Sequence, residues 1–183
     1  MNSNLSFFPI IYAPNEIFKK QAEYIDIVDD NIRIIIDKML KTMQIEKAVG
    51  LGANMVGILK RIAIVDLHEN NKSSPIILIN PEIIYFSEEK QTFMERSLSF
   101  PGIAANITRS KTIKVKYLDY DGNKQELDAE GFLATVIQHK VDYLNGKTFL
   151  DYLSKLKRDN LLKKMEKYLK LYPPHVHGTG CRH

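Results

Sequence analysis

The sequence predicts an α+β fold in which antiparallel sheets surround a central helix, with another helix at the C-terminal end. Three observations lead to this prediction: short β-branched runs separated by turn residues, apolar stripes with helical spacing, and one segment that is apolar over most of a helix surface. The chain has 183 residues, and 44% of them are hydrophobic. We expect one globular domain over residues 1–171, which is long enough for one substantial core.

The first helix is predicted to begin near Asp29 and Asp30. Two acidic residues at this point suit the positive end of a helix dipole. The apolar residues that follow recur at helical spacing and define one stripe, formed by Ile32, Ile35, Ile36, Met39 and Met43.

Four short runs favour β-strands because they are rich in β-branched residues or alternate with a period of two. They cover residues 61–65, 76–79, 112–117 and 124–127. Residues 70–75, with the sequence NNKSSP, are typical of a loop between the first two. Asp121-Gly122 supplies a tight turn between the last two, which predicts an antiparallel hairpin.

The central helix is predicted at residues 130–144, and Gly146 is a plausible stop just beyond it. Its apolar residues occupy much of the circumference, and such a helix is usually buried. They are Phe132, Leu133, Val136, Ile137, Val141 and Leu144.

The last helix is predicted from Leu153, and it is strongly basic. Its expected apolar positions are Leu156, Leu161, Leu162, Met165, Tyr168 and Leu169. From Leu153 onward the chain has eight Lys or Arg and two acidic residues, a net charge of +6, whereas the whole chain carries +4. The basic character therefore belongs to the C-terminal region.

The ends of the chain bear on location and on metal binding. The only cysteine is Cys181, so no disulfide framework is expected, and a reducing, cytoplasmic location follows. The apolar segment 5–12 is short and contains Pro9, so we expect neither a signal peptide nor a membrane span. Residues 172–183 are predicted to form a flexible tail whose His and Cys residues either are unstructured or bind a transition metal. These residues are His175, His177, Cys181 and His183.

Three motifs carry the strongest functional signal. Residues 48–55 read AVGLGANM, residues 95–99 read ERSLS, and residues 138–144 read QHKVDYL. In order and spacing they resemble the peptide deformylase motifs G-x-G-L-A-A-x-Q, E-G-C-L-S and Q-H-E-x-D-H-L. The resemblance covers about residues 8–171, and it implies the deformylase fold.

The resemblance also implies a reaction and a set of site residues. Deformylases hydrolyse the N-formyl amide of a new polypeptide with a divalent metal, iron, nickel or zinc, held by one cysteine and two histidines, while a glutamate manages the proton. In this chain His139 keeps the first histidine position. The other positions are changed: Ser97 stands for the cysteine, Tyr143 for the second histidine, Lys140 for the glutamate and Met55 for the glutamine of the first motif.

Each of these changes opposes metal-dependent hydrolysis. Ser97 and Tyr143 are neutral, weak ligands near neutral pH. Lys140 would repel a divalent ion by about 4 kcal/mol per unit of charge product at ~4 Å and an effective dielectric of about 20. We therefore expect no cofactor unless the degenerate site still binds a divalent metal.

The ordinary structural roles of these residues are also expectations to test. In these roles His139 is a partly buried, hydrogen-bonded histidine, and Ser97 and Tyr143 satisfy each other's hydroxyl groups. Lys140 is then solvated or ion-paired. Met55 is expected only to pack in the core.

Several functional alternatives stay open. One is residual deformylase activity. A second is a metal-free hydrolase in which Ser97 is the nucleophile, Lys140 its base and the Leu98 amide part of an oxyanion hole. A third is a ribosome-binding module that uses the basic C-terminal helix.

A substrate groove is implied by the resemblance at Gly50, Gly52, Met55 and Leu98, although Arg96 replaces the glycine of the second motif, and the groove arginine of the family falls at Ala104. The ribosome and a nascent peptide are the partners to consider. We expect neither binding to a membrane nor specific binding to DNA, and the oligomeric state stays open.

Overall fold

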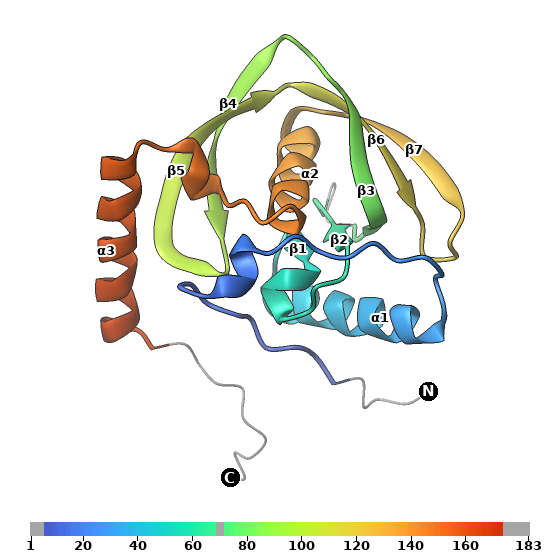
Figure 1. The fold of residues 1–183 in the computed structure, drawn as a ribbon, viewed down its shortest axis with the longest axis horizontal. Coiled ribbons are helices and arrows are strands. Elements are labelled where there is room, and N and C mark those ends of the chain that lie inside the picture. The colour runs from blue at the N-terminus through green and yellow to red at the C-terminus, as the bar shows by residue number, and fades with distance from the viewer. Residues whose placement is uncertain (1–5, 69–71, 174–183) are drawn as a thin grey trace.

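The computed structural model describes residues 6–68 and 72–173. Within them, two antiparallel sheets enclose a central helix (Figure 1). The five-stranded sheet has the order β1-β2-β3-β6-β7, and the two-stranded sheet is β4-β5. The strands are β1 Gly50–Gly52, β2 Ile62–Val65, β3 Ile76–Phe86, β4 Lys90–Ser97, β5 Phe100–Ser110, β6 Thr112–Leu118 and β7 Lys124–Glu130. The α-helices are α1 Asp30–Ile45, α2 Gly131–Leu144 and α3 Lys155–Leu171, with short 3-10 helices at Glu16–Lys19, Ala53–Val56 and Phe149–Tyr152. The predicted α+β class is confirmed.

Helix α1 begins where its sequence predicts. The Asp29 side chain accepts a hydrogen bond from the Ile32 amide at 2.9 Å and so caps the first turn. The face that carries Ile32, Ile36 and Met39 is buried in the main core. The spacing of these apolar residues therefore gave both the position and the orientation of the helix.

Helix α2 is the centre of the molecule, as its all-round apolar surface predicts. In Figure 1 it lies between the β4-β5 hairpin and the five-stranded sheet. Its buried residues include polar ones, among them Gln138, His139 and Lys140. Gly146, with φ of 75°, follows its end as the sequence suggests.

The β4-β5 hairpin was missed by sequence reasoning. Its strands pair from Lys90 opposite Ser110 to Glu95 opposite Ala105. Polar residues occur along both strands, and Pro101-Gly102 interrupts the second, so neither shows a clear apolar alternation. The strand expected at residues 76–79 is also longer than predicted, because β3 continues to Phe86.

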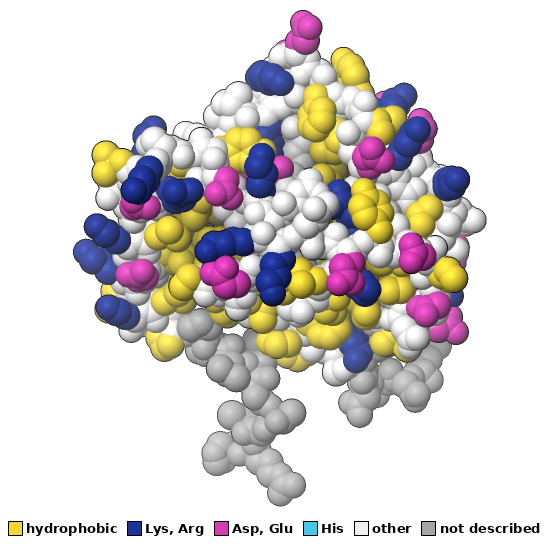
Figure 2. Space-filling model, in the orientation of Figure 1, with side chains coloured by type: hydrophobic (Ala, Val, Ile, Leu, Met, Phe, Trp, Pro, Cys, Tyr) yellow, Lys and Arg dark blue, Asp and Glu magenta, His cyan; other side chains and the backbone are white. Residues whose placement is uncertain are grey.

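Helix α3 packs against β5 on the outside of the molecule (Figure 1). The Ser154 hydroxyl accepts a hydrogen bond from the Lys157 amide and caps the helix. Met165 is its only fully buried residue, and Leu156, expected on the apolar stripe, is 72% exposed. Lys and Arg side chains gather over this edge of the molecule in Figure 2.

Two further findings concern the predicted ends and membrane segments. In the part of the chain that the structure describes, every helix is too short or too polar to cross a bilayer. The tail predicted at 172–183 lies outside the described residues from position 174 onward, so its flexibility and its metal binding stay predictions.

Candidate functional site

The residues singled out by the motifs come from four neighbouring elements. His139, Lys140 and Tyr143 lie on α2, and Ser97 ends β4. Gly50 begins β1, and Met55 lies in the 3-10 helix Ala53–Val56. The short β1 strand and this 3-10 turn pack against α2, so segments far apart in the chain meet at one place.

A surface groove of about 410 Å³ opens beside these residues. Of the predicted groove residues, Gly50 and Leu98 line it, whereas Gly52 and Met55 are fully enclosed by the core. Lys140, Ser97 and Arg96 also line the groove, and the Arg96 side chain is exposed. The groove is thus bounded by two basic side chains and several apolar ones.

One ring nitrogen of His139 has a hydrogen-bond partner, and the other has none. Its Nδ1 atom lies 2.6 Å from Glu95 Oε2, which confirms the expected hydrogen-bonded histidine. Its ring stacks on Tyr143 and on Phe149, with ring centroids 4.9 and 6.0 Å apart. Its Nε2 atom is buried and has no hydrogen-bond partner. Burial, assisted by the charge of Lys140, lowers the pKa of His139 to about 4, so the ring is neutral near pH 7.

Glu95 connects His139 to a buried ionic network. Arg109 donates from Nε to Oε1 at 2.5 Å and from Nη2 to Oε2 at 3.0 Å, a bidentate pair. The same guanidinium donates to Asp142 Oδ2 at 2.7 Å, and Tyr152 donates its hydroxyl to that oxygen as well. Burial alone would raise the pKa of Glu95, but its bonds with His139 and Arg109 outweigh this and lower it.

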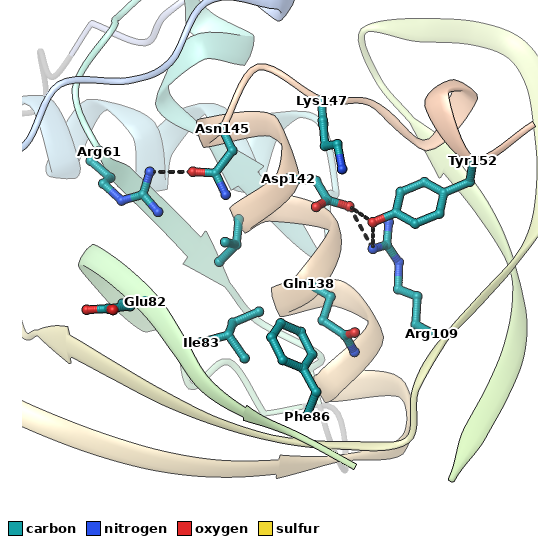
Figure 3. Close-up of a pocket in the computed structure, with 11 residues that line it drawn as sticks. Arg61, Glu82, Ile83, Phe86, Arg109, Gln138, Asp142, Asn145, Lys147 and Tyr152 are labelled. Atoms are coloured by element: carbon teal, nitrogen blue, oxygen red, sulfur yellow. Dashed lines mark hydrogen bonds and ion pairs between the residues drawn. The ribbon is translucent and has the colours of Figure 1, made fainter. Parts of the chain in front are cut away.

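This network reaches a second pocket of about 370 Å³ on another side of α2, drawn in Figure 3. There Arg109 and Tyr152 converge on Asp142, and Arg61 points to Asn145 with a hydrogen bond of 2.7 Å. The sequence reasoning did not identify Arg109. Glu95 and Asp142 lie within the second and third motifs, so their positions were a usable signal.

Lys140 corrects a sequence expectation, because it is neither solvated nor ion-paired. It is 5% exposed, and no salt bridge to it occurs within the described residues. Its Nζ contacts the sulfur of Met55 at 3.6 Å and lies 5.4 Å from the centre of the Tyr143 ring. Burial lowers the pKa of Lys140 to about 8, against an opposing effect of the Glu95 charge.

Gly50 makes room for this buried lysine. A Cβ atom at position 50 would stand 2.9 Å from Lys140 Cε and 3.0 Å from a methyl group of Val136. Both distances are shorter than ordinary carbon contacts. The glycine of the first motif therefore allows the Lys140 side chain of α2 to pack against β1.

Tyr143 and Ser97 also depart from expectation, because they do not satisfy each other. The Tyr143 hydroxyl is buried without a hydrogen-bond partner, and Ser97 Oγ accepts a bond from the Ser99 amide at 3.3 Å. Burial raises the pKa of Tyr143, while the nearby Ser97 hydroxyl acts in the opposite direction without reaching hydrogen-bond geometry. Tyr143 is thus a neutral phenol whose proton is free to be donated.

Comparison with known proteins places this geometry in a family. A family described as polypeptide deformylase has a model that matches residues 7–159. A protein of Rickettsia conorii named peptide deformylase-like is 79% identical over the whole of both chains. Peptide deformylase 1 of Pseudomonas syringae pv. tomato is 43% identical over 91% of this chain and 99% of its own. A crystal structure of peptide deformylase from Ehrlichia chaffeensis is 38% identical with a TM-score of 0.85, and the match covers 91% of this chain and 98% of that one.

Proposed function

Because the chain belongs to the peptide deformylase family, we propose that it is a deformylase-like protein that no longer removes N-formyl groups by metal-dependent hydrolysis. The observation that carries this proposal is the buried, unpaired Lys140 beside His139. A cation in this place opposes a divalent ion, and a protonated amine cannot act as the general base.

The donor set supports the same proposal. His139 Nε2 has no hydrogen-bond partner, so its lone pair could coordinate a metal. The neighbouring positions, however, supply a serine hydroxyl and a phenol whose pKa is raised. Over residues 6–68 and 72–173, no group of three or more His, Cys, Asp and Glu side chains could hold a metal ion. Thiolate and imidazole ligands, by contrast, are what a stable transition-metal site needs. The residues present therefore do not fit the family's metal.

Metal analysis combined with a hydrolysis assay tests this proposal. The purified full-length chain is incubated separately with iron, nickel and zinc, desalted and analysed for bound metal. The same samples are then assayed on a formyl-methionyl peptide. We expect less than stoichiometric metal and no turnover above buffer. Stoichiometric metal that is lost in His139→Ala, together with robust turnover, would show residual deformylase activity instead.

The metal-free serine hydrolase is a weaker candidate. Lys140 Nζ contacts the Met55 sulfur, and no hydrogen bond joins it to Ser97 Oγ. A general base should lie within hydrogen-bond reach of the proton that it removes. A serine-directed phosphonate probe decides the matter, because labelling of Ser97 that disappears in Lys140→Ala would establish the pair.

The exposed basic residues of α3 favour a second function, binding to the ribosome. The helix is anchored on β5 through Met165, and its basic residues Lys155, Lys157, Lys163, Lys164, Lys167 and Lys170 are exposed. Exposed lysines along one helix suit a phosphate backbone, and such binding weakens steeply with salt.

Cosedimentation with ribosomes at low salt tests this second function. The full chain should pellet with ribosomes, and a variant with Lys163, Lys164 and Lys167 changed to Glu should stay in the supernatant. Changing Lys90, Lys114 and Lys116 to Glu, which lie on strands away from α3, provides a control of equal charge that should still pellet. Equal sedimentation of both triple variants would contradict a role for α3.

A further inference from the structure

The pocket drawn in Figure 3 is lined by a buried cation that has no anionic partner. Arg61 is 4% exposed, and in the part of the chain that the structure describes no carboxylate forms an ion pair with it. Its guanidinium has five N–H groups, but its side-chain hydrogen bonds there are two: to Asn145 Oδ1 at 2.7 Å and to the Pro81 carbonyl oxygen at 2.9 Å. Burial lowers the pKa of Arg61, because the charged form loses solvation. A buried charge ordinarily has a counterion, and Arg61 lacks one.

Two further hydrogen-bond donors line the same pocket, just beyond the end of α2. Asn145 Oδ1 accepts the bond from Arg61, so the amide nitrogen is the end of this side chain that is left to donate. Lys147 is exposed, and within the described residues it forms no ion pair; its Nζ lies 5.9 Å from the centre of the Tyr152 ring. In Figure 3 the Asn145 amide nitrogen and the Lys147 side chain both point into the pocket.

The two acidic residues that line the pocket leave these donors free. One oxygen of Asp142 already accepts from Arg109 and from the Tyr152 hydroxyl, each at 2.7 Å. Glu82 is exposed, and in Figure 3 its carboxylate points away from the centre of the pocket. Its charge opposes the effect of burial on the pKa of Arg61, but the two side chains are not bonded to each other in the structure.

We propose that this pocket binds a small carboxylic acid with an apolar ring, whose carboxylate is held by Arg61 and Lys147 with the Asn145 amide as a further donor. A carboxylate only accepts hydrogen bonds, and its two oxygens match a guanidinium group, so it complements all three side chains. The site shares no lining residue with the groove formed by the motif residues. It is therefore independent of the function proposed above.

The remaining wall of the pocket fits the apolar ring of such a ligand. Ile83, Phe86 and Val141 line it, and its volume of about 370 Å³ falls within the range of small-molecule pockets. Val141 is buried, whereas Phe86 is 52% and Tyr152 46% exposed. A ring bound against these aromatic side chains would cover apolar surface that now faces water.

Nuclear magnetic resonance titration of the full-length, nitrogen-15-labelled protein with matched probes tests the proposal. The acid 3-phenylpropionate carries the charge and the ring, 3-phenylpropanamide is its neutral analogue, and acetate has the charge without the ring. At pH 7 we expect the acid to bind at least roughly tenfold more tightly than either of the other two. The largest shifts should occur at the Asn145 side-chain amide and the Arg61 Nε–H. Equal affinity for acid and amide, equal affinity for acid and acetate, or largest shifts at Gly50 and Leu98 in the motif groove would each overturn the proposal.

Variants of exposed residues locate the effect without disturbing the core. Lys147→Met should weaken binding of the acid about 2- to 10-fold and leave that of the amide unchanged. Lys41→Met removes an exposed cation from α1, away from the pocket, and should bind both probes as the wild type does. Glu82→Gln removes a nearby negative charge and should strengthen binding of the acid about twofold or more. Phe86→Ala should weaken binding of acid and amide by the same factor.

Arg61→Gln tests the buried cation itself. It should weaken binding of the acid roughly 10- to 100-fold, which would bring its affinity close to that of the amide. Because Arg61 also bonds Pro81 and Asn145, the fold of this variant is checked first by circular dichroism. If it does not fold, Lys147→Met and Glu82→Gln decide the matter, and an unchanged affinity for the acid in both of them overturns the proposal.

Discussion

His139 shows how burial fixes the charge state of one residue in this protein. Its ordinary pKa of 6.5 falls to about 4 in the folded chain. Between these values the unfolded chain binds a proton that the folded chain does not, so protonation favours unfolding. This contribution to stability is complete above about pH 6.5 and is lost as the pH falls toward 4.

We expect the free energy of unfolding to decrease by ~3 kcal/mol from this residue as the pH falls through that window. Urea denaturation at a series of pH values measures it. His139→Gln, which can still donate to Glu95, should flatten the dependence between pH 6.5 and 4. If the variant and the wild type lose stability in parallel, His139 is not the titrating group.

Glu95 makes the second prediction at this scale, because it neutralises Arg109 inside the core. Both side chains are less than 5% exposed, and removing Glu95 leaves the buried Arg109 charge with Asp142 alone as its ion-pair partner and His139 without its acceptor. Glu95→Gln should therefore lower the free energy of unfolding by about 3 to 5 kcal/mol in urea denaturation. Glu89→Gln, which breaks the exposed pair with Lys111, should cost less than ~1 kcal/mol. Similar losses in the two variants would contradict the distinction.

At the scale of elements, Met165 holds α3 to the rest of the molecule. It is 1% exposed, whereas Leu156 on the same helix is 72% exposed. Met165→Ala should destabilise the protein by about 2 to 5 kcal/mol, because it removes buried surface and leaves a cavity. Leu156→Ala should change stability by no more than about 0.5 kcal/mol. Thermal denaturation of the two variants compares them directly, and equal midpoints would mean that α3 does not depend on Met165.

The close approach of α3 to β5 explains why this contact matters. Gly102 on β5 has φ of +72°, and the Tyr168 ring occupies the place where a Cβ atom would stand. A side chain at position 102 would thus displace the helix as well as strain the backbone. The sequence alone shows a glycine after a proline, and no local pattern there reveals that a helix packs against it.

Elements with one dominant apolar pattern could be predicted from the sequence, and elements without one could not. Helices α1 and α2 follow from spacing, since their side chains face one core or are buried all round. The β4-β5 hairpin was missed because Thr92, Glu95 and Arg96 interrupt its apolar residues. Buried Glu95 is stabilised there by Arg109, a partner fourteen residues away that no local pattern reveals.

The same limit applied to the site. Of the residues that the motifs select, Ser97 and Lys140 line one groove, and His139 and Tyr143 lie buried on the same helix as Lys140. Their individual environments could not be predicted. Lys140 is buried because α2 is packed on both sides, and this depends on tertiary contacts of β1 and the 3-10 helix Ala53–Val56. Solvation of a lysine is the usual outcome, and here packing overrides it.

At the scale of the whole molecule, a buried ionic network supports the candidate site from behind. Glu95, Arg109 and Asp142 form a continuous buried network that orients His139 from behind. Such supporting bonds normally fix the ring of a metal-binding histidine and keep its other nitrogen free. His139 Nε2 is free in this structure. The network therefore holds His139 with one ring nitrogen directed away from its hydrogen-bond partners.

The function proposed above predicts that four side-chain changes are enough to give this site metal binding. Combining Met55→Gln, Ser97→Cys, Lys140→Glu and Tyr143→His should yield a protein that retains close to one equivalent of zinc or nickel after desalting, measured by elemental analysis. Each single variant should retain little, since ligands act together and the cation at position 140 remains in three of the four.

A triple variant with Met55→Gln, Ser97→Cys and Tyr143→His keeps Lys140. It therefore measures how much the Lys140 charge alone weakens metal binding. With the cysteine and histidine restored but the amine still present, repulsion of about 4 kcal/mol per unit of charge product at ~4 Å and an effective dielectric of about 20 should weaken metal binding far below that of the quadruple variant. Equal metal content in the triple and quadruple variants would show that Lys140 turns away from the metal. A folded quadruple variant without metal would show that the scaffold, and not only the four side chains, has lost the geometry of the family.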